Sequence, residues 1–264
     1  MKKNMHKEKK KHKKNSKKRK QVGILFVLIG VLLILVFGFG EYQSYKSAIE
    51  IRKLQQLKEA SSDNGNGIDT SKILPEYRNL YKTNSDLVGW LVVNGTQINY
   101  PVVQSTVYQE FYLDHNFDGE NDESGAVFAD ARNDVFKPDD NVILYGHNMK
   151  NGSMFAQLKK FSSNSDTYEK SKYFWIFTPE KNYRYEIISA YTTGAKSDTY
   201  TLFKGPGEEF QEYLKKIRGY SEIQTDAGDL TVKDKIVTLS TCTGNQATRY
   251  VVQGRRVDAL DVAQ

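Results

Sequence analysis

Residues 235–252 read KIVTLSTCTGNQATRYVV, and the chemistry predicted for the chain depends on this stretch. A β-branched run leads into Cys242, the only cysteine of the 264 residues, and a polar turn separates it from a second β run that begins at Arg249. The pattern predicts a strand that ends on a thiol and a returning strand that begins with a fixed positive charge. Such a scaffold suits a nucleophile and a group that stabilises an anion. A buried structural cysteine is the competing interpretation.

The positive charge of the chain is concentrated near its N-terminus. The net charge is +6, but residues 2–20 contain 12 of the 38 basic residues and a single acidic one, Glu8. The rest of the chain holds 26 basic and 31 acidic residues, which gives a net charge of −5. A mildly acidic body argues against a basic groove for nucleic acid.

An uncharged segment follows the basic tail. Residues 22–40 read VGILFVLIGVLLILVFGFG, and as a helix they would span roughly 28 Å, about the thickness of a bilayer's hydrocarbon core. The basic cluster before the segment predicts a cytoplasmic N-terminus and an extracellular body. A cleaved secretory signal is the alternative, but the run is long for a signal core and no clear cleavage site follows it. The sequence therefore predicts a single-pass protein of the cell membrane.

The predicted organisation has four parts. Residues 1–21 are the cytoplasmic tail and residues 22–40 the transmembrane helix. Residues 41–70 form a stalk or linker, which contains the flexible stretch 61–67. Residues 71–264 form the extracellular domain, to which the chemistry below is assigned.

The extracellular domain is predicted to be mainly β with added helices. Runs of β-branched and aromatic residues predict strands at 89–93, 98–103, 126–130, 141–145, 172–178 and 182–193. Helices are predicted at 154–161 and 208–220. With the two strands around Cys242, seven or eight short strands predict a closed or nearly closed β-barrel.

A cysteine nucleophile needs a base or an ion-pair partner, and histidine is the usual one. Two of the four histidines lie in the basic tail, which leaves His115 and His147. His147 follows the strand 141–145 and a glycine that permits a sharp turn, so its imidazole is expected at the rim of the barrel. His115 lies in the polar loop 113–117, and we interpret it as a surface histidine.

Arg249 is the predicted third member of the site. It begins the strand that returns from Cys242, so its guanidinium can reach the same rim. Arginine is always charged and has several donors, so it can hold a carbonyl group and then the oxyanion that forms on attack. Arg255 and Arg256 are successive residues on that strand and face opposite sides, so at most one faces the site. Solvated charge is the preferred interpretation of both.

Taken in order, these motifs resemble a known family. TLSTC at 238–242, followed by Arg249 and preceded by LYGH at 144–147, resembles a sortase, and the TLSTC form is similar to class B. NYPVVQ at 99–104 and FYL at 111–113 also resemble class B sequences. The likeness covers about residues 75–260.

The resemblance implies an eight-stranded sortase-type β-barrel with an N-terminal helix and a helix before the penultimate strand. It implies a membrane-anchored cysteine transpeptidase of Gram-positive cell surfaces, with catalytic residues Cys242, His147 and Arg249 and no cofactor. The thiolate would attack the threonine carbonyl of a C-terminal sorting signal similar to N-P-x-T-N or P-x-T-G, while Arg249 holds the oxyanion and His147 protonates the leaving amine. An amino group of peptidoglycan or of its lipid-linked precursor would then resolve the thioester and so attach the surface protein to the cell wall.

The resemblance also implies three substrate-binding residues, Ser240, Leu113 and Tyr200. Gln109 stands where some relatives have a substrate-contacting asparagine, so that contact is not transferred to this chain. The connection from Cys242 to Arg249 is shorter than in some class B members, so the shape of that loop is not transferred either.

Class A sortases use acidic residues to bind calcium, and this chain has several acidic residues in its middle part. We interpret them as a solvated acidic loop and predict no metal site. They are Glu120, Asp122, Glu123, Asp130, Asp134, Asp139 and Asp140.

Other functions remain open at this level. An L,D-transpeptidase also uses cysteine, histidine and arginine at the cell wall, but the Ser-His-Gly-Cys-type run expected of one is absent. An NlpC/P60-like cysteine peptidase has its cysteine before its histidine, whereas His147 precedes Cys242 here. A non-enzymatic wall-binding module with a structural cysteine is the third alternative. Pilin polymerisation is disfavoured, because no Asp-Pro-Trp-type lid segment is evident.

Overall fold

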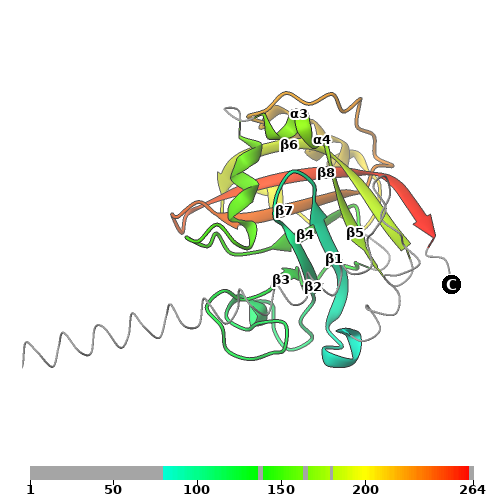
Figure 1. Cartoon of the computed structure of the whole chain (residues 1–264). Coiled ribbons are helices and arrows are strands. Elements are labelled where there is room, and N and C mark those ends of the chain that lie inside the picture. The colour runs from blue at the N-terminus through cyan, green and yellow to red at the C-terminus, as the bar shows by residue number, and fades with distance from the viewer. Residues whose placement is uncertain (1–79, 136–138, 163–165, 179–180, 262–264) are drawn as a thin grey trace, which may run out of the picture. The chain divides into compact units, whose positions relative to one another are not determined.

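The computed structural model describes residues 80–135, 139–162, 166–178 and 181–261. Eight strands in these ranges close into a barrel in the order β1-β2-β3-β4-β7-β8-β6-β5 (Figure 1). The strands are β1 (Leu87–Val93), β2 (Asn99–Val103), β3 (Val127–Ala129), β4 (Asn141–Tyr145), β5 (Tyr173–Phe177), β6 (Lys181–Gly194), β7 (Ile236–Cys242) and β8 (Thr248–Asp261). The mainly β, eight-stranded barrel is therefore confirmed.

The order of the strands brings distant segments of the chain together. Most neighbours are antiparallel, including β1 and β2, whose connection contains Gly95 at a φ of 72°. By contrast, β4 and β7 are parallel, with Tyr145 opposite Ser240. Parallel neighbours need a long crossover, which here includes β5, β6 and the helix before β7. Because β4 and β7 run in the same direction, the residues that follow their ends lie at the same rim of the barrel.

The helical segments are short, apart from the one before β7. They are η2 (Phe111–Leu113), η3 (Phe155–Phe161), α3 (Thr167–Lys170), η4 (Asp198–Tyr200) and α4 (Glu208–Gly219). The helix predicted at 154–161 is thus a 3-10 segment, and α4 is the predicted helix before the penultimate strand. Residues 80–83 are helical, and the rest of the expected N-terminal helix lies outside the described residues.

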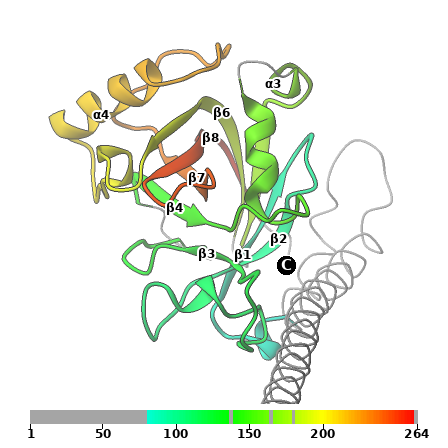
Figure 2. The same ribbon diagram turned by 90° about the vertical axis from the view of Figure 1, so that its left-hand side faces the viewer.

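α4 covers the outside of the barrel at β6 and β7 (Figure 2). Its buried residues Phe210, Tyr213, Leu214 and Ile217 follow helical spacing and make one apolar stripe. Two glutamates in its first turn and two basic residues in its last turn match the charges that the helix dipole favours at each end.

Alternating residues of each strand face the barrel interior or its outer surface. On β7, Val237 and Leu239 belong to the main core inside the barrel, whereas Ile236 packs outside under α4. A second outer cluster contains Val103, Tyr112 and Phe128 and covers β2 and β3.

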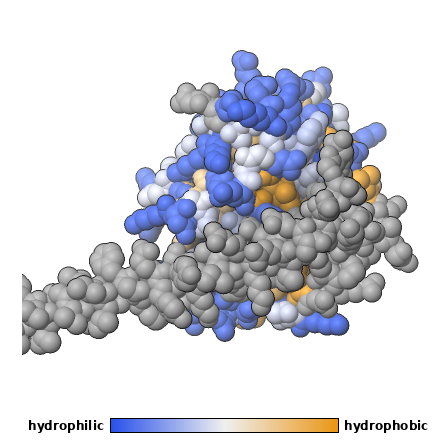
Figure 3. Space-filling model, in the orientation of Figure 1, coloured by the Kyte–Doolittle hydropathy of each residue, from blue (hydrophilic) through white to orange (hydrophobic). Residues whose placement is uncertain are grey.

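Most of the described surface in Figure 3 is hydrophilic, apart from an apolar patch near the middle of the view and a few smaller apolar areas. Within the described ranges, no helix is both long enough and apolar enough to cross a bilayer. The predicted tail (1–21), transmembrane helix (22–40) and stalk (41–70) lie outside those ranges.

Candidate active site

The outward-facing residues of β7 pass from full burial to an open cavity. Ile236 lies under α4, and Thr238 is buried with its hydroxyl donating to the side chain of Asn141 at 2.9 Å. Ser240 is only 2% exposed. Cys242 ends the strand half-buried and lines a cavity of about 380 Å³. The strand thus presents its thiol at the first outward position that no other element covers.

Strand register places Arg249 beside the thiol. Cys242 and Arg249 are direct partners in the antiparallel pair β7–β8, so their side chains leave the same face of the sheet. Nη1 of Arg249 donates to the carbonyl oxygens of Gln246 at 2.8 Å and Thr248 at 2.9 Å. These bonds hold the guanidinium by one of its nitrogens, so the other two can donate to a bound ligand.

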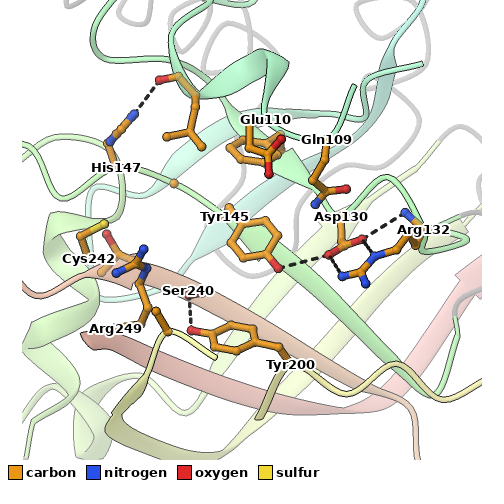
Figure 4. A pocket seen from close by; sticks show the side chains of 15 residues that line it. Gln109, Glu110, Asp130, Arg132, Tyr145, His147, Tyr200, Ser240, Cys242 and Arg249 are labelled. Atoms are coloured by element: carbon orange, nitrogen blue, oxygen red, sulfur yellow. Dashed lines mark hydrogen bonds and ion pairs between the residues drawn. The ribbon is translucent and has the colours of Figure 1, made fainter. Parts of the chain in front are cut away.

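His147 reaches the same cavity from the end of β4. A Cβ on Gly146 would lie 2.7 Å from the ring of Phe155, so only glycine fits this turn. The carbonyl of His147 accepts a hydrogen bond from the amide of Phe155 at 2.8 Å, which closes the loop after the histidine. Its Nε2 lies 2.6 Å from the carbonyl oxygen of Leu113 (Figure 4).

All six residues predicted for the site line this one cavity. They are Cys242, His147, Arg249, Ser240, Leu113 and Tyr200. Figure 4 shows Cys242 and Arg249 at one end of it and Asp130 and Arg132 at the other, with Tyr145 between them. The catalytic and binding roles of these residues remain predictions, whereas their convergence is a property of the structure.

The part of the cavity that Asp130, Arg132 and Tyr145 form was not predicted from the sequence. Asp130 is fully buried, and its carboxylate accepts bonds from the Arg132 guanidinium at 2.9 and 2.8 Å and from the Tyr145 hydroxyl at 3.2 Å. Burial alone would raise the pKa of Asp130, but the bonds from Arg132 and Tyr145 outweigh it and lower the pKa. Tyr145 lies two residues before His147, and strand periodicity could have placed it on the same face.

Tyr200 forms the opposite wall. Its hydroxyl is 2.8 Å from that of Ser240, and its ring centroid is 6.3 Å from that of Tyr145. Burial raises the pKa of Tyr200, and the bond to Ser240 and the charge of Arg249 offset only part of this. The hydroxyl therefore stays protonated, and buried Ser240 contributes by holding the Tyr200 ring.

The interpretation of the acidic residues as a solvated loop is wrong for three of them. Asp122, Asp130 and Asp140 are buried. The carboxylate of Asp122 accepts from the nearby amide of Ser124 at 2.8 Å, whereas Asp140 pairs with Lys235, which is 95 positions away in the chain. Across the described residues, no three acidic, histidine or cysteine side chains gather as they would around a metal ion.

Two further expectations are wrong. His115 is not a plain surface residue, because its side chain is only 16% exposed and its ring stacks on Phe111 at 4.1 Å. Arg255 is not simply solvated, since it forms a half-buried ion pair with Glu186. The charge pattern of the sequence reveals neither contact. His115 is covered by aromatic stacking, and the partner of Arg255 lies far away in the sequence.

Asp130→Asn should lower the free energy of unfolding at pH 7 by about 1–2 kcal/mol, because the charge-assisted bonds from largely exposed Arg132 weaken. The folded-state pKa of Asp130 lies below the unfolded value of about 3.9. The carboxylate therefore stabilises the fold above that value, and this contribution disappears as the pH falls through the folded-state pKa. Denaturant titrations of the variant and wild type should converge in acid. Asp118→Asn, at an exposed carboxylate, is the control, and a gap that persists in acid would contradict the expectation.

A closed barrel with a thiol, an imidazole and a guanidinium around one open cavity defines a cysteine enzyme that acts on a carbonyl group. The sequence matches the sortase domain over residues 91–257, and the chain belongs to the sortase family. It is a cysteine transpeptidase of the sortase B type. Because the chain belongs to the sortase family, it is not an L,D-transpeptidase, an NlpC/P60-like peptidase or a non-enzymatic wall-binding module.

Relatives and solved structures match most of the chain. Sortase B of Listeria monocytogenes is 35% identical over 243 residues, which is 89% of this chain and 95% of the relative. The Staphylococcus aureus sortase B–substrate complex is 30% identical with a TM-score of 0.72, and the match covers 84% of this chain and 100% of that one. A sortase B complexed with triglycine is 29% identical with a TM-score of 0.69, over 84% of this chain and 99% of that one.

Proposed function

We propose that this enzyme cleaves a C-terminal sorting signal after a threonine and joins the new acyl end to an amine of peptidoglycan or of its lipid-linked precursor. The observation that supports this best is the shared cavity, where Cys242, His147 and Arg249 meet at an open rim. The similar sortase B structures with a substrate and with triglycine support a peptide donor and an amine acceptor.

In the first half-reaction, the sulfur of Cys242 attacks the threonine carbonyl carbon and its proton passes to His147. The carbonyl electrons move to the oxygen, where Arg249 donates hydrogen bonds to the oxyanion. The carbon–nitrogen bond then breaks, and the leaving amine takes the proton from His147. A thioester on Cys242 remains.

In the second half-reaction, an acceptor amine attacks the thioester carbon and gives its proton to His147. The carbon–sulfur bond breaks, and the proton returns to the sulfur, so the enzyme is unchanged. Water at the same position would give hydrolysis instead, and the acceptor must therefore compete with water at the rim.

The walls of the cavity suit a short, largely apolar peptide with a few polar groups. Leu113 is 40% exposed and offers an apolar contact, while Tyr200 is held in place by Ser240. We assign Leu113 and Tyr200 to direct substrate contact and Ser240 to the positioning of Tyr200. The signal is expected to resemble N-P-x-T-N or P-x-T-G.

The chain organisation proposed for this role has a cytoplasmic tail (1–21), a transmembrane helix (22–40), a stalk (41–70) and an extracellular catalytic domain (71–264). The apolar run and the basic cluster before it support this arrangement. It would hold the catalytic domain at the outer face of the membrane, where a lipid-linked precursor is within reach.

A peptide-library assay with the full-length chain in mild detergent tests the function. Peptides that contain N-P-x-T-N-like and P-x-T-G-like signals are incubated with and without triglycine, and the products are identified by mass spectrometry. We expect cleavage directly after threonine and, with triglycine, a new threonine–glycine peptide bond. Cleavage at other positions, or equal cleavage of peptides with alanine in place of threonine, would rule the proposal out.

A further inference from the structure

The Leu113 carbonyl determines which nitrogen of His147 carries a proton. Nε2 of His147 lies 2.6 Å from that carbonyl oxygen, as the dashed line in Figure 4 marks. A carbonyl oxygen can only accept a hydrogen bond, so Nε2 must donate. In the neutral imidazole, Nδ1 is then the nitrogen with a free lone pair.

The Leu113 carbonyl is fixed by the residues around it. The amide of Leu113 donates to the carbonyl of Glu110 at 2.9 Å within η2. Next to it, Tyr112 is 2% exposed, and its hydroxyl donates to Asp86 at 2.9 Å and accepts from Asn84 at 2.8 Å. η2 is therefore anchored to the start of β1, and the acceptor for His147 has little freedom to move.

Gly125 packs directly against this carbonyl. Its φ is 57°, and a Cβ there would lie 2.5 Å from the carbonyl oxygen of Tyr112 and 2.7 Å from that of Leu113. Gly119 lies in the same loop with a φ of 78°, but a Cβ there would have no atom within 4 Å. The two glycines have similar backbone conformations, and only Gly125 touches the acceptor.

We propose that the Leu113 carbonyl, seated against Gly125, is a positioning device that fixes His147 as the Nε2–H tautomer and reserves Nδ1 for proton exchange at the reaction centre. Nδ1 then takes the proton from the Cys242 thiol and gives it to the leaving amine, while the Nε2 proton stays on the ring. This inference rests on the proposed function, in which His147 is the acid and base. Because the Leu113 side chain lines the substrate cavity, the residue that contacts the peptide also orients the imidazole.

The tautomer can be measured in the unmodified protein. The full-length chain with ¹⁵N-labelled histidine, in mild detergent, is studied by NMR of the ring nitrogens, and a His147→Gln sample identifies the His147 signals. We expect the neutral His147 ring to show a protonated Nε2 and an unprotonated Nδ1. The opposite tautomer, or a rapidly exchanging mixture, would overturn the proposal without any variant.

Gly125→Ala and Gly119→Ala form a matched pair, because both place alanine at a positive φ but only the first displaces the Leu113 carbonyl. We expect Gly125→Ala to lower kcat by about 10- to 100-fold, with a smaller effect on KM and loss of the wild-type tautomer signal. Gly119→Ala should keep kcat within about twofold of wild type, and its Tm should fall by less than that of Gly125→Ala, because the added Cβ at residue 119 meets no other atom.

A folded Gly125→Ala protein with the kcat and tautomer of Gly119→Ala would overturn the inference. Failure of the proposed function looks different, because the wild-type chain would then fail to cleave after threonine whatever tautomer its histidine adopts. A thermal transition measured for each variant shows that the compared proteins are folded.

Discussion

Cys242→Ala is expected to abolish cleavage of sorting peptides and transfer to triglycine, a loss on the order of 10⁴-fold or more. The reason is that no other thiol exists in the chain, so no thioester can form. The sulfur sits at the end of β7 with only part of its surface buried, so its removal should change the free energy of unfolding by about 0.5 kcal/mol or less. Product analysis and thermal unfolding measure the two effects. Turnover that survives the substitution would remove the nucleophile assignment.

Thiol labelling provides an independent check of the same residue. A small alkylating reagent should modify wild-type Cys242 completely under native conditions, because the residue lines an open cavity. Prior incubation with a sorting peptide should slow the modification if the peptide occupies that cavity. A thiol that stays unmodified until the protein is denatured would instead indicate a structural cysteine.

Arg249→Lys should lower kcat by about 10²- to 10³-fold although the positive charge is kept. In the wild type, Nη1 holds the carbonyls of Gln246 and Thr248 while the other guanidinium nitrogens can face the oxyanion. A lysine has a single nitrogen and cannot do both. Steady-state kinetics with a sorting peptide measure the loss.

Arg256→Lys is the matched control for this substitution. Arg256 lies on the same strand, but its guanidinium is over the ring of Tyr183, with 5.3 Å to the ring centroid, away from the cavity. Its replacement should leave kcat within about twofold, since surface changes of this kind have small effects. Equal rates for the two lysine variants would show that Arg249 has no special part in the reaction.

Much of the fold could be predicted because the signals are local. β-branched runs bounded by turns marked the strands, and one hairpin brought Cys242 and Arg249 face to face. His147 was found because it follows a strand and a glycine. Each of these inferences needs only a few neighbouring residues, together with the knowledge that histidine is the usual partner of a thiol.

The rest of the site depends on contacts between segments that are far apart in the chain. The bond from His147 to Leu113 joins residues 34 positions apart, and the Tyr200–Ser240 bond joins residues 40 positions apart. The spacing of these residues in the sequence does not reveal which residue each of them bonds to. Asp130 was misread for a related reason, since composition alone gives no sign that a carboxylate next to a short strand is buried and bound to Arg132.

The closed ring of strands has a consequence for how a peptide can be recognised. Each of the eight strands in the described part of the barrel has a neighbouring strand on both sides, and the pairing leaves only short free stretches, such as residues 188–194 of β6 on the side of β5. The closed ring therefore offers little room for β-augmentation, in which a peptide ligand extends a sheet as one more strand. We expect the main-chain amides and carbonyls of a bound sorting peptide to find partners mainly among loops and side chains, so that substitutions in a few discrete subsites would change selectivity without disturbing the scaffold.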